Sequence, residues 1–217
     1  EAKNAGIPVI IVDREVAVED ERLYLFGIGS DFYSEGLTAV EWLEDELEQS
    51  GKVGAFGVSN HSPAQIELLK KSVKQKLVIN QMQLSIPHAF MLSAGANVNI
   101  QNNDGVNRDG YLRDYCRLNS ITIQPWSPLQ YGFIKAPFLQ NEELADLNKV
   151  IAEVAEKYGV TDTALSIAWL LRLPDKMQPV VGSVNPQRIR DIAAAADITM
   201  SREDWYKIYL AAGYRLP

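Results

Sequence analysis

Hydrophobic and polar positions along the chain repeat with two different periods. Short runs rich in valine, isoleucine and aromatic residues alternate with longer stretches in which apolar residues recur every three to four positions. The first pattern is typical of buried strands and the second of amphipathic helices. Their alternation from end to end predicts βα units around a parallel sheet, which is an α/β fold. The predicted strands are residues 7–13, 23–29, 53–59, 77–84, 121–126 and 179–183.

The predicted helices lie between these strands, and several carry a recognisable start signal. Ser62 and Asn185 each precede a proline at the first helical position, and Ser201 stands three residues before an acidic residue. Residues 85–107 are rich in Asn, Gly and Ala with little periodicity, which predicts a long functional loop. The predicted helices are residues 37–48, 63–72, 110–117, 142–158, 161–173, 186–195 and 202–212.

The composition limits the classes of function. With 217 residues, of which 47% are hydrophobic, the chain can form one large α/β domain or two small ones. A formal net charge of −7 argues against a protein that binds the nucleic-acid backbone. No apolar run approaches the roughly 18 residues of a membrane span, and no signal peptide is recognisable. We therefore expect a cytoplasmic protein with neither nucleic-acid nor membrane partners.

The few cysteine and histidine residues argue against disulfide bonds and against metal sites. Cys116 is the single cysteine, so neither an internal disulfide nor a cysteine zinc site is expected. His61 and His88 lack metal-ligand spacing to a carboxylate or to that cysteine. We expect no metal site.

Small polar residues follow the ends of three predicted strands. Ser59 and Asn60 end one strand, Gln81 lies in the next, and Trp126 and Ser127 end a third. In parallel α/β folds, ligands collect at the carboxyl ends of strands. An amide pair suits a neutral planar ligand with donors and acceptors, and an indole offers a stacking face. The alternative is that these side chains only satisfy loop backbone groups, and the spacing leaves both interpretations open.

The segment GSVNPQRIR, residues 182–190, predicts a second ligand contact. A Gly-Ser turn leads into a helix that begins with proline, so free backbone N–H groups face outward at the helix start. Arg188 and Arg190 lie in the first turns of that helix. Together these features predict a phosphate site.

The G-x-G of RLYLFGIGSDF tests a different nucleotide-binding hypothesis. A dinucleotide fingerprint requires a third glycine at position 32, which is Phe32. The sequence therefore excludes a Rossmann turn here. Asp13 and Arg14, at the end of the first predicted strand, form either a structural ion pair or a hydrogen-bonding pair for a polyol, and both readings stay open.

From about residue 39 to residue 217, the sequence resembles the aldo-keto reductases, in particular bacterial oxidoreductases of that superfamily. The matching stretches include GKVGAFGVSNHSPAQIELL, VINQMQLSIPHAF, ITIQPWSPLQYG and VVGSVNPQRI. This resemblance implies a (β/α)8 barrel that uses NADPH to reduce carbonyl groups. It further implies that residues 85–107 border the substrate pocket.

The same resemblance implies a role for each cofactor-binding residue. The nicotinamide carboxamide would contact Ser59, Asn60 and Gln81, and the ring would stack on Trp126. The pyrophosphate would lie along Ser127, Leu129 and Gly132. The adenosine ribose and its phosphate would contact Ser183, Asn185 and Arg188.

Residues 1–36 resemble a different family, the type I periplasmic sugar-binding proteins near the galactofuranose and ribose binders. In that comparison Arg14 matches an arginine that hydrogen-bonds the sugar ring. These two resemblances predict an engineered chimera in which a periplasmic βαβ fragment, residues 1–38, is fused to a partial TIM barrel, residues 39–217. The predicted seam lies between Gly36 and Glu48.

The catalytic groups of the reductase family have no counterpart in this sequence. The family needs a tyrosine as proton donor, a lysine and an aspartate that lower its pKa, and a histidine that orients the carbonyl. The first three belong to early strands of the family, and GIGSDF stands where the histidine is expected. Asp31 and Tyr33 lie near that position without an evident partner.

Three functional hypotheses follow from these resemblances. The first is a chimera without catalysis that keeps weak NADPH binding; the alternatives are a working NADPH-dependent reductase and a sugar-binding module that uses Arg14.

Six predicted strands instead of eight leave an open barrel, unless residues upstream supply the others. Because open edges of parallel strands invite pairing, we also expect self-association.

Overall fold

The computed structural model describes residues 10–13, 26–29, 50–51, 54–132 and 135–217. The chain divides into two compact units, residues 1–54 and 55–217. In the first unit, β1 (Ile10–Asp13) and β2 (Phe26–Gly29) pair in parallel, with Ile10 opposite Phe26. Both lie inside the predicted strands. The predicted helix 37–48 and three residues of interest, Arg14, Asp31 and Tyr33, lie outside the described residues.

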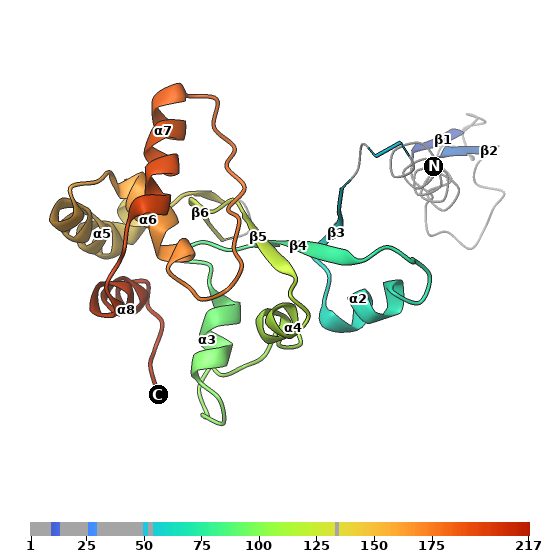
Figure 1. Cartoon of the computed structure of the whole chain (residues 1–217), viewed down its shortest axis with the longest axis horizontal. Helices are drawn as coiled ribbons and strands as arrows, with labels where there is room; N and C mark the ends of the chain where they lie inside the picture. The colour runs from blue at the N-terminus through green and yellow to red at the C-terminus, as the bar shows by residue number, and fades with distance from the viewer. Residues whose placement is uncertain (1–9, 14–25, 30–49, 52–53, 133–134) are drawn as a thin grey trace, which may run out of the picture. The chain divides into compact units, whose positions relative to one another are not determined.

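The second unit contains a parallel sheet built from βα units. Strands β3 (Phe56–Ser59), β4 (Leu77–Gln83) and β5 (Thr122–Trp126) lie side by side in that order (Figure 1). Helix α2 (Pro63–Leu69) connects β3 to β4, and α4 (Leu112–Leu118) precedes β5. These elements confirm the predicted strands and helices within a few residues.

The last predicted strand, residues 179–183, is wrong in its position. Residues 176–180 run beside β5: Ile123 N donates to Lys176 O at 2.9 Å, and Val180 N donates to Pro125 O at 2.8 Å. The pairing stops there because Ser127, just past the end of β5, has a φ of 49° and turns the chain away. The segment therefore pairs three residues earlier than predicted, and no regular strand forms. Among the described residues β3 pairs only with β4, so self-association through an open edge stays a prediction.

Helices dominate the rest of the second unit. The side chains of Ser62, Asn185 and Ser201 accept hydrogen bonds from backbone N–H groups of the first turn, as predicted. Within the described ranges, no helix combines the length and the apolar character that crossing a bilayer needs. The helices are α5 (Ala145–Tyr158), α6 (Asp162–Leu171), α7 (Pro186–Ala194) and α8 (Arg202–Ala211), with 3-10 turns η4 (Glu142–Leu144) and η5 (Ala195–Asp197).

The predicted long loop 85–107 is wrong over part of its length, because α3 (Phe90–Ala96) forms inside it. Leu92 of this helix is buried. The start of the helix is explained by a residue far along the chain, because the N–H of Ala89 donates to the hydroxyl of Tyr214 at 2.6 Å. A short hairpin, β6 (Gln130–Tyr131) with β7 (Ala136–Pro137), was not predicted either.

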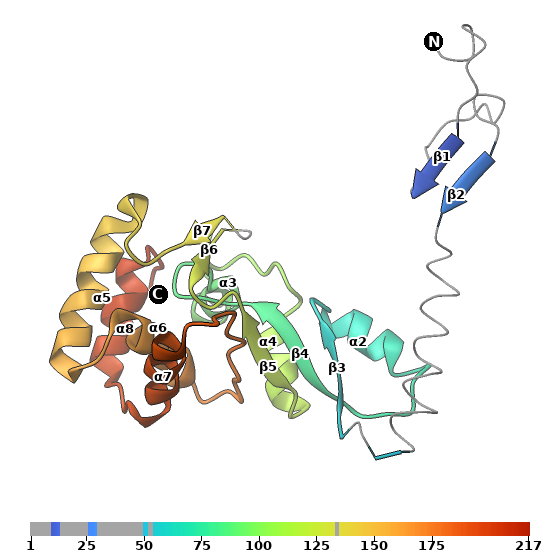
Figure 2. The same cartoon turned by 90° about the horizontal axis from the view of Figure 1, so that it is seen from above.

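The larger hydrophobic core lies between α5, α6 and α8, which gather at one end of the second unit (Figure 2). Its centre is a parallel stack of Trp169 on Trp205, with ring centroids 4.7 Å apart and an interplanar angle of 3°. Each indole N–H donates to the backbone carbonyl of the other tryptophan, at 3.1 Å and 2.9 Å. The stack continues through Tyr209 to Tyr214. This column fixes α8 rigidly against α6.

A smaller core lies between the sheet and helices α2 and α4. It is formed by Ile66, Leu77, Leu112, Cys116, Ile121 and Ile123. Cys116 is completely buried, and this burial raises the pKa of its thiol to about 11. The cysteine is therefore a structural residue in the folded chain.

Candidate functional site

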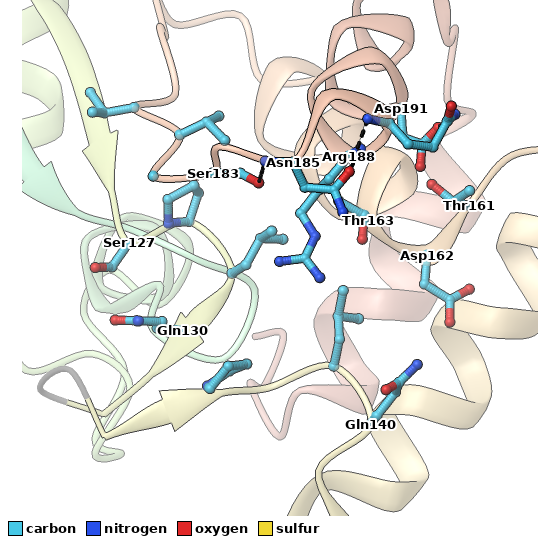
Figure 3. Close-up of a pocket in the computed structure, with 18 of the residues that line it drawn as sticks. Ser127, Gln130, Gln140, Thr161, Asp162, Thr163, Ser183, Asn185, Arg188 and Asp191 are labelled. Carbon is cyan, nitrogen blue, oxygen red and sulfur yellow. Dashed lines mark hydrogen bonds between the residues drawn. The ribbon is translucent and has the colours of Figure 1, made fainter.

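A cleft of about 870 Å³ opens beside the carboxyl end of β5, between the β6–β7 hairpin and the first turns of α6 and α7 (Figure 3). This volume lies in the range of roughly 300–1,000 Å³ that is typical of sites for small molecules and cofactors. Six of the predicted cofactor-binding residues line the cleft: Trp126, Ser127, Leu129, Ser183, Asn185 and Arg188.

The three residues predicted to hold the nicotinamide carboxamide lie beside this cleft and do not line it. Asn60 connects them: its backbone N–H donates to Gln81 O at 2.8 Å, and its side-chain Nδ2 donates to Ser59 Oγ at 2.8 Å. Trp126 Nε1 donates to Asn60 Oδ1 at 3.2 Å. Asn60 has a φ of 57°, a conformation that asparagine adopts more readily than most residues. These bonds join the ends of β3, β4 and β5 into one polar edge next to the cleft.

A ladder of glutamine side chains extends this polar edge. Gln81 Nε2 donates to Gln124 Oε1 at 2.8 Å, and Gln124 Nε2 donates to Gln178 Oε1 at 2.9 Å. Gln81 and Gln124 are direct neighbours in the parallel register of β4 and β5. The ladder uses one N–H of the side-chain amide of Gln81, and the Oε1 of that amide has no hydrogen-bond partner among the described residues, so it can accept from a ligand. Sequence reasoning missed Gln124 and Gln178, since only the strand register reveals that they align.

Arg188 supplies a positive charge to the cleft. Asn185 Oδ1 accepts from the N–H groups of Gln187 and Arg188, and Ser183 Oγ accepts from Asn185 N at 3.3 Å. These bonds fix the start of α7, and the guanidinium of Arg188 extends from it into the cleft (Figure 3). No described residue forms an ion pair or hydrogen bond with that guanidinium. Arg190, predicted as part of the phosphate site, does not line the cleft and instead contacts Gln187.

The β6–β7 hairpin forms the opposite wall. The carbonyl of Leu129 accepts from Phe138 N at 3.1 Å, and the carbonyl of Gly132 accepts from Gln83 Nε2. Gly132 has a φ of 57° and serves the turn, and it lies outside the lining of the cleft. Gln130, which sequence reasoning missed, lines the cleft and has a buried Oε1 without a partner among the described residues.

The residues of the cleft fit a nicotinamide dinucleotide. An unpaired guanidinium at a helix N-terminus suits a phosphate, and the orphaned amide oxygen of Gln130 can accept from a hydroxyl or amide group. The indole of Trp126 offers a ring face. Acidic side chains, Asp162 and Asp191, also line the cleft, which limits its net positive charge.

One cluster in the second unit combines a tyrosine, a lysine and a carboxylate, as the reductase catalytic site does, but it has glutamate in place of aspartate, lacks the histidine and lies away from the cleft. Tyr115 on α4 donates to Glu67 on α2 and accepts from Lys70 Nζ at 2.9 Å. Burial, with the bond to Glu67, raises the pKa of Tyr115, whereas a proton donor needs a lowered one. None of the three lines the cleft. These hydrogen bonds link α4 to α2, which is a structural role.

The two histidines have separate contacts in the second unit. The ring of His61 is bonded to the carbonyl of Ser59 at 2.8 Å, and His88 packs edge-on against Phe90 with ring centroids 4.9 Å apart. Burial lowers the pKa of His88. The described ranges contain no group of three or more His, Cys, Asp or Glu side chains that could hold a metal ion.

Comparison with known proteins identifies the family. The model of the aldo/keto reductase family matches residues 33–210. This chain belongs to the aldo/keto reductase family. The chain is 33% identical over 170 residues to a 6-dehydroglucose reductase of Agrobacterium fabrum, a match that covers 77% of this chain and 50% of that protein. It is also 33% identical over 175 residues to the oxidoreductase YdhF of Escherichia coli, covering 79% of this chain and 51% of that protein. The chain thus spans about half the length of these relatives.

Solved structures confirm the fold class. The aldo-keto reductase MGS-M4, from a deep-sea metagenome library, matches with a TM-score of 0.57 and 24% identity, over 99% of this chain and 64% of that one. The thermostable aldo-keto reductase Tm1743 matches with a TM-score of 0.57 and 19% identity, over 97% of this chain and 62% of that one. The predicted α/β fold of parallel βα units, as in part of a TIM barrel, is confirmed.

The predicted chimera gains no support from these comparisons. The family match begins at residue 33, before the predicted seam between Gly36 and Glu48, and extends to residue 210. Nothing found points to a periplasmic sugar-binding component. The family match favours the second hypothesis, a reductase, over the inactive chimera.

Proposed function

We propose that this chain supplies the cofactor site of an NAD(P)H-dependent carbonyl reductase, with NADPH as the preferred cofactor. One observation carries the proposal: a single cleft joins an indole at the end of β5, Trp126, to an unpaired arginine at the start of α7, Arg188. These two groups match the two ends of a nicotinamide dinucleotide, an aromatic ring and a phosphate. The family membership points to the same cofactor class.

Each part of the cleft contributes a different interaction. Ser59, Asn60 and Gln81 would hold the carboxamide of the nicotinamide, and the glutamine ladder would keep the free oxygen of Gln81 in place as an acceptor. Trp126 would cover one face of the ring. When bound, the cofactor supplies the hydride that reduces the carbonyl carbon.

The adenosine end would lie along the start of α7. Arg188 would pair with the phosphate on the ribose, and this charge pair is the reason that we expect NADPH to bind more tightly than NADH. Ser183 and Asn185 would contact the ribose, and Ser127 and Leu129 would follow the pyrophosphate. Gly132, which lies outside the lining, would act only through the turn of the hairpin.

Sugar-derived carbonyl compounds are the substrate class that we infer. Two relatives, at 33% and 30% identity, are named 6-dehydroglucose reductase. The four catalytic groups that the family resemblance implies have no assigned counterpart among the described residues. Turnover is therefore a separate part of the proposal from cofactor binding, and it is tested separately.

Titration of the full chain with NADPH and with NADH, followed by nucleotide fluorescence, tests the cofactor site. We expect saturable binding that is tighter for NADPH. Arg188→Gln should weaken NADPH binding by roughly tenfold to a hundredfold, because a charged hydrogen bond is lost, and should affect NADH less. Lys149→Gln, on an exposed part of α5 outside the cleft, removes the same charge and should change neither affinity. Equal affinities of Arg188→Gln and the parent chain for NADPH would sink the proposal.

Oxidation of NADPH with 6-dehydroglucose or a simple aldehyde tests turnover. Consumption of NADPH that depends on the carbonyl compound supports a working reductase. Binding of NADPH without its consumption would support the cofactor site and refute catalysis by this chain. That outcome corresponds to the first hypothesis, NADPH binding without catalysis, but without a chimeric origin.

A further inference from the structure

A second concave site, of about 430 Å³, lies on another part of the second unit and shares no residue with the cofactor cleft. Its walls come from α3, from the chain just after α6, and from α8, which can be followed in Figure 1. Arg113 of α4 completes it. The proposed cofactor function makes no use of this site.

Three arginines line this site, and they are in different states. Arg113 is already paired, because its Nε and Nη2 donate to the carboxylate of Asp175 at 3.0 Å and 2.8 Å. Arg172 donates from Nε to the carbonyl of Met200 at 2.7 Å, which leaves its two terminal nitrogens without a partner among the described residues. The side chain of Arg202 has no ion pair or hydrogen bond there either. Two guanidinium groups are thus available at one concave surface of a chain whose net charge is −7.

The position of Arg202 is unfavourable for the helix that carries it. It is the first residue of α8, where the positive end of the helix dipole favours acidic side chains such as the Glu203 that follows. Arg172, in contrast, lies at the end of α6, where a cation stabilises the helix dipole. Helix stability therefore accounts for Arg172 and not for Arg202.

Aromatic rings form the adjoining wall. Trp205 is held by its stacks on Trp169 and Tyr209 and by the reciprocal N–H bonds with Trp169, so its indole presents a fixed edge to the site. Tyr206 meets it edge-on, with ring centroids 5.0 Å apart, and is 38% exposed. Rings that are already fixed lose little conformational freedom when a ligand packs on them.

We propose that this site binds a small organic anion that carries an aromatic ring, either a carboxylate or a phosphate monoester. Arg172 and Arg202 bind the acidic group, since planar guanidinium groups pair well with carboxylate and phosphate oxygens. The ring packs against the exposed side of Tyr206 and the edge of the Trp205 indole. Arg113, held by Asp175, forms the fixed cationic floor.

Binding of benzoate and of phenyl phosphate to the full chain, measured by calorimetry and by tryptophan fluorescence, tests the proposal. We expect saturable binding of at least one of them, and their relative affinities identify the acidic group. Benzamide, which lacks the charge, and inorganic phosphate, which lacks the ring, should each bind at least tenfold more weakly. Equal binding of benzamide or of inorganic phosphate would overturn the proposal.

Variants locate the binding. Arg202→Gln, at an exposed position, should weaken binding about tenfold without loss of folding, and the double variant Arg172→Gln/Arg202→Gln should weaken it further. Lys149→Gln serves as the charge control and should bind normally. Arg188→Gln should also bind normally, and NADPH should not compete, because the cofactor cleft is elsewhere. Loss of binding in Arg188→Gln, or competition by NADPH, would assign the anion to the cofactor cleft and refute the second site.

Discussion

Helices α6 and α7 pack against each other and line the same cleft, but the surroundings of their side chains are opposite. In α6 every residue from Ala164 to Leu170 is buried. In α7 no residue is buried, and the helix begins with a proline and a capping asparagine that accepts from the N–H groups of Gln187 and Arg188. The free N–H groups expected from the sequence are thus occupied, and the Arg188 side chain is the group that faces the cleft. One helix belongs to the core, and the other lies on its surface.

This difference separates stability from binding. Burial of a whole helix surface contributes free energy of folding, whereas a surface helix stays close to the low-stability end of the molecule, where ligand-binding segments are common. Changes around α6 should therefore act on global unfolding, and changes in α7 should act on local opening and on affinity. The following substitutions test this separation.

Trp169→Ala in α6 should have the largest effect. The change removes the ring that stacks on Trp205 and leaves the carbonyl of Trp205 without its donor. We expect a loss of about 3–5 kcal/mol in the free energy of unfolding, as for other buried aromatic residues. Urea unfolding monitored by circular dichroism measures it, with the 49% exposed Leu210→Ala on α8 as the control. A loss under about 1 kcal/mol would show that the stack is not the centre of the core.

Asp204→Asn should destabilise the α8 side by about 2 kcal/mol, since charged hydrogen bonds are lost at a buried carboxylate. Burial acts to raise the pKa of Asp204, but the bonds from Lys157, Tyr158 and Ser201 outweigh it, and the pKa is lowered.

The sign of the pH dependence follows from that lowered pKa. The carboxylate stabilises the fold above the pKa of the unfolded chain, and this stability is lost as the pH falls through the lower pKa of the folded chain. The difference between parent and Asp204→Asn should therefore shrink in acid below about pH 4. Unfolding midpoints measured across this range check it, and a difference that stays constant would contradict the assignment.

The two helix caps provide the most direct comparison. Thr161→Ala removes the bond to Ala164 N at the start of α6, and Asn185→Ala removes the bonds to Gln187 N and Arg188 N in α7. Each cap is worth about 1 kcal/mol. We expect Thr161→Ala to lower global stability, and Asn185→Ala mainly to speed amide hydrogen exchange within α7 and to weaken NADPH binding. Similar global losses in both variants would break the distinction between the helices.

His88→Gln should have the smallest effect, and only on pH dependence. Burial lowers the pKa of His88, so below about pH 6.5 the unfolded chain takes up its proton before the folded chain does. Stability should therefore fall as the pH drops from 6.5 through the folded pKa, and the variant should lack this component. Parallel unfolding curves for parent and variant between pH 7 and 5 would contradict it.

Local signals predicted most of the fold. Periodicity and capping residues located α6, α7 and α8, and β-branched runs located β3, β4 and β5 within a few residues. The sequence did not predict α3, because its Asn- and Gly-rich surroundings favour a loop and the contact that accounts for its start, from Tyr214 to Ala89, spans the length of the unit. Tertiary contacts of this kind leave no local pattern.

The candidate site divides in the same way. Residues such as Asn185 and Arg188 stand in a recognisable turn and helix start, and Trp126 follows a strand. Gln124 aligns with Gln81 only through the strand register, and Gln130 matters only because its amide oxygen is buried without a partner. The chimeric interpretation gained no support, and the reason is related: strands that end in polar residues before a helix recur in parallel α/β families, so a short stretch does not distinguish one family from another.

The single cysteine of the chain has a practical consequence. Cys116 is completely buried in the smaller core, and its raised pKa keeps the thiol protonated at neutral pH. Because the thiol is completely buried, a reagent can reach it only when the smaller core opens, and it then reacts with the thiolate form. The rate of thiol modification thus measures how often the smaller core opens. Tryptophan fluorescence, in contrast, reports on the larger core. A lower rate of Cys116 modification in the presence of NADPH would show that ligand binding at the cleft stabilises the smaller core on the other side of the sheet.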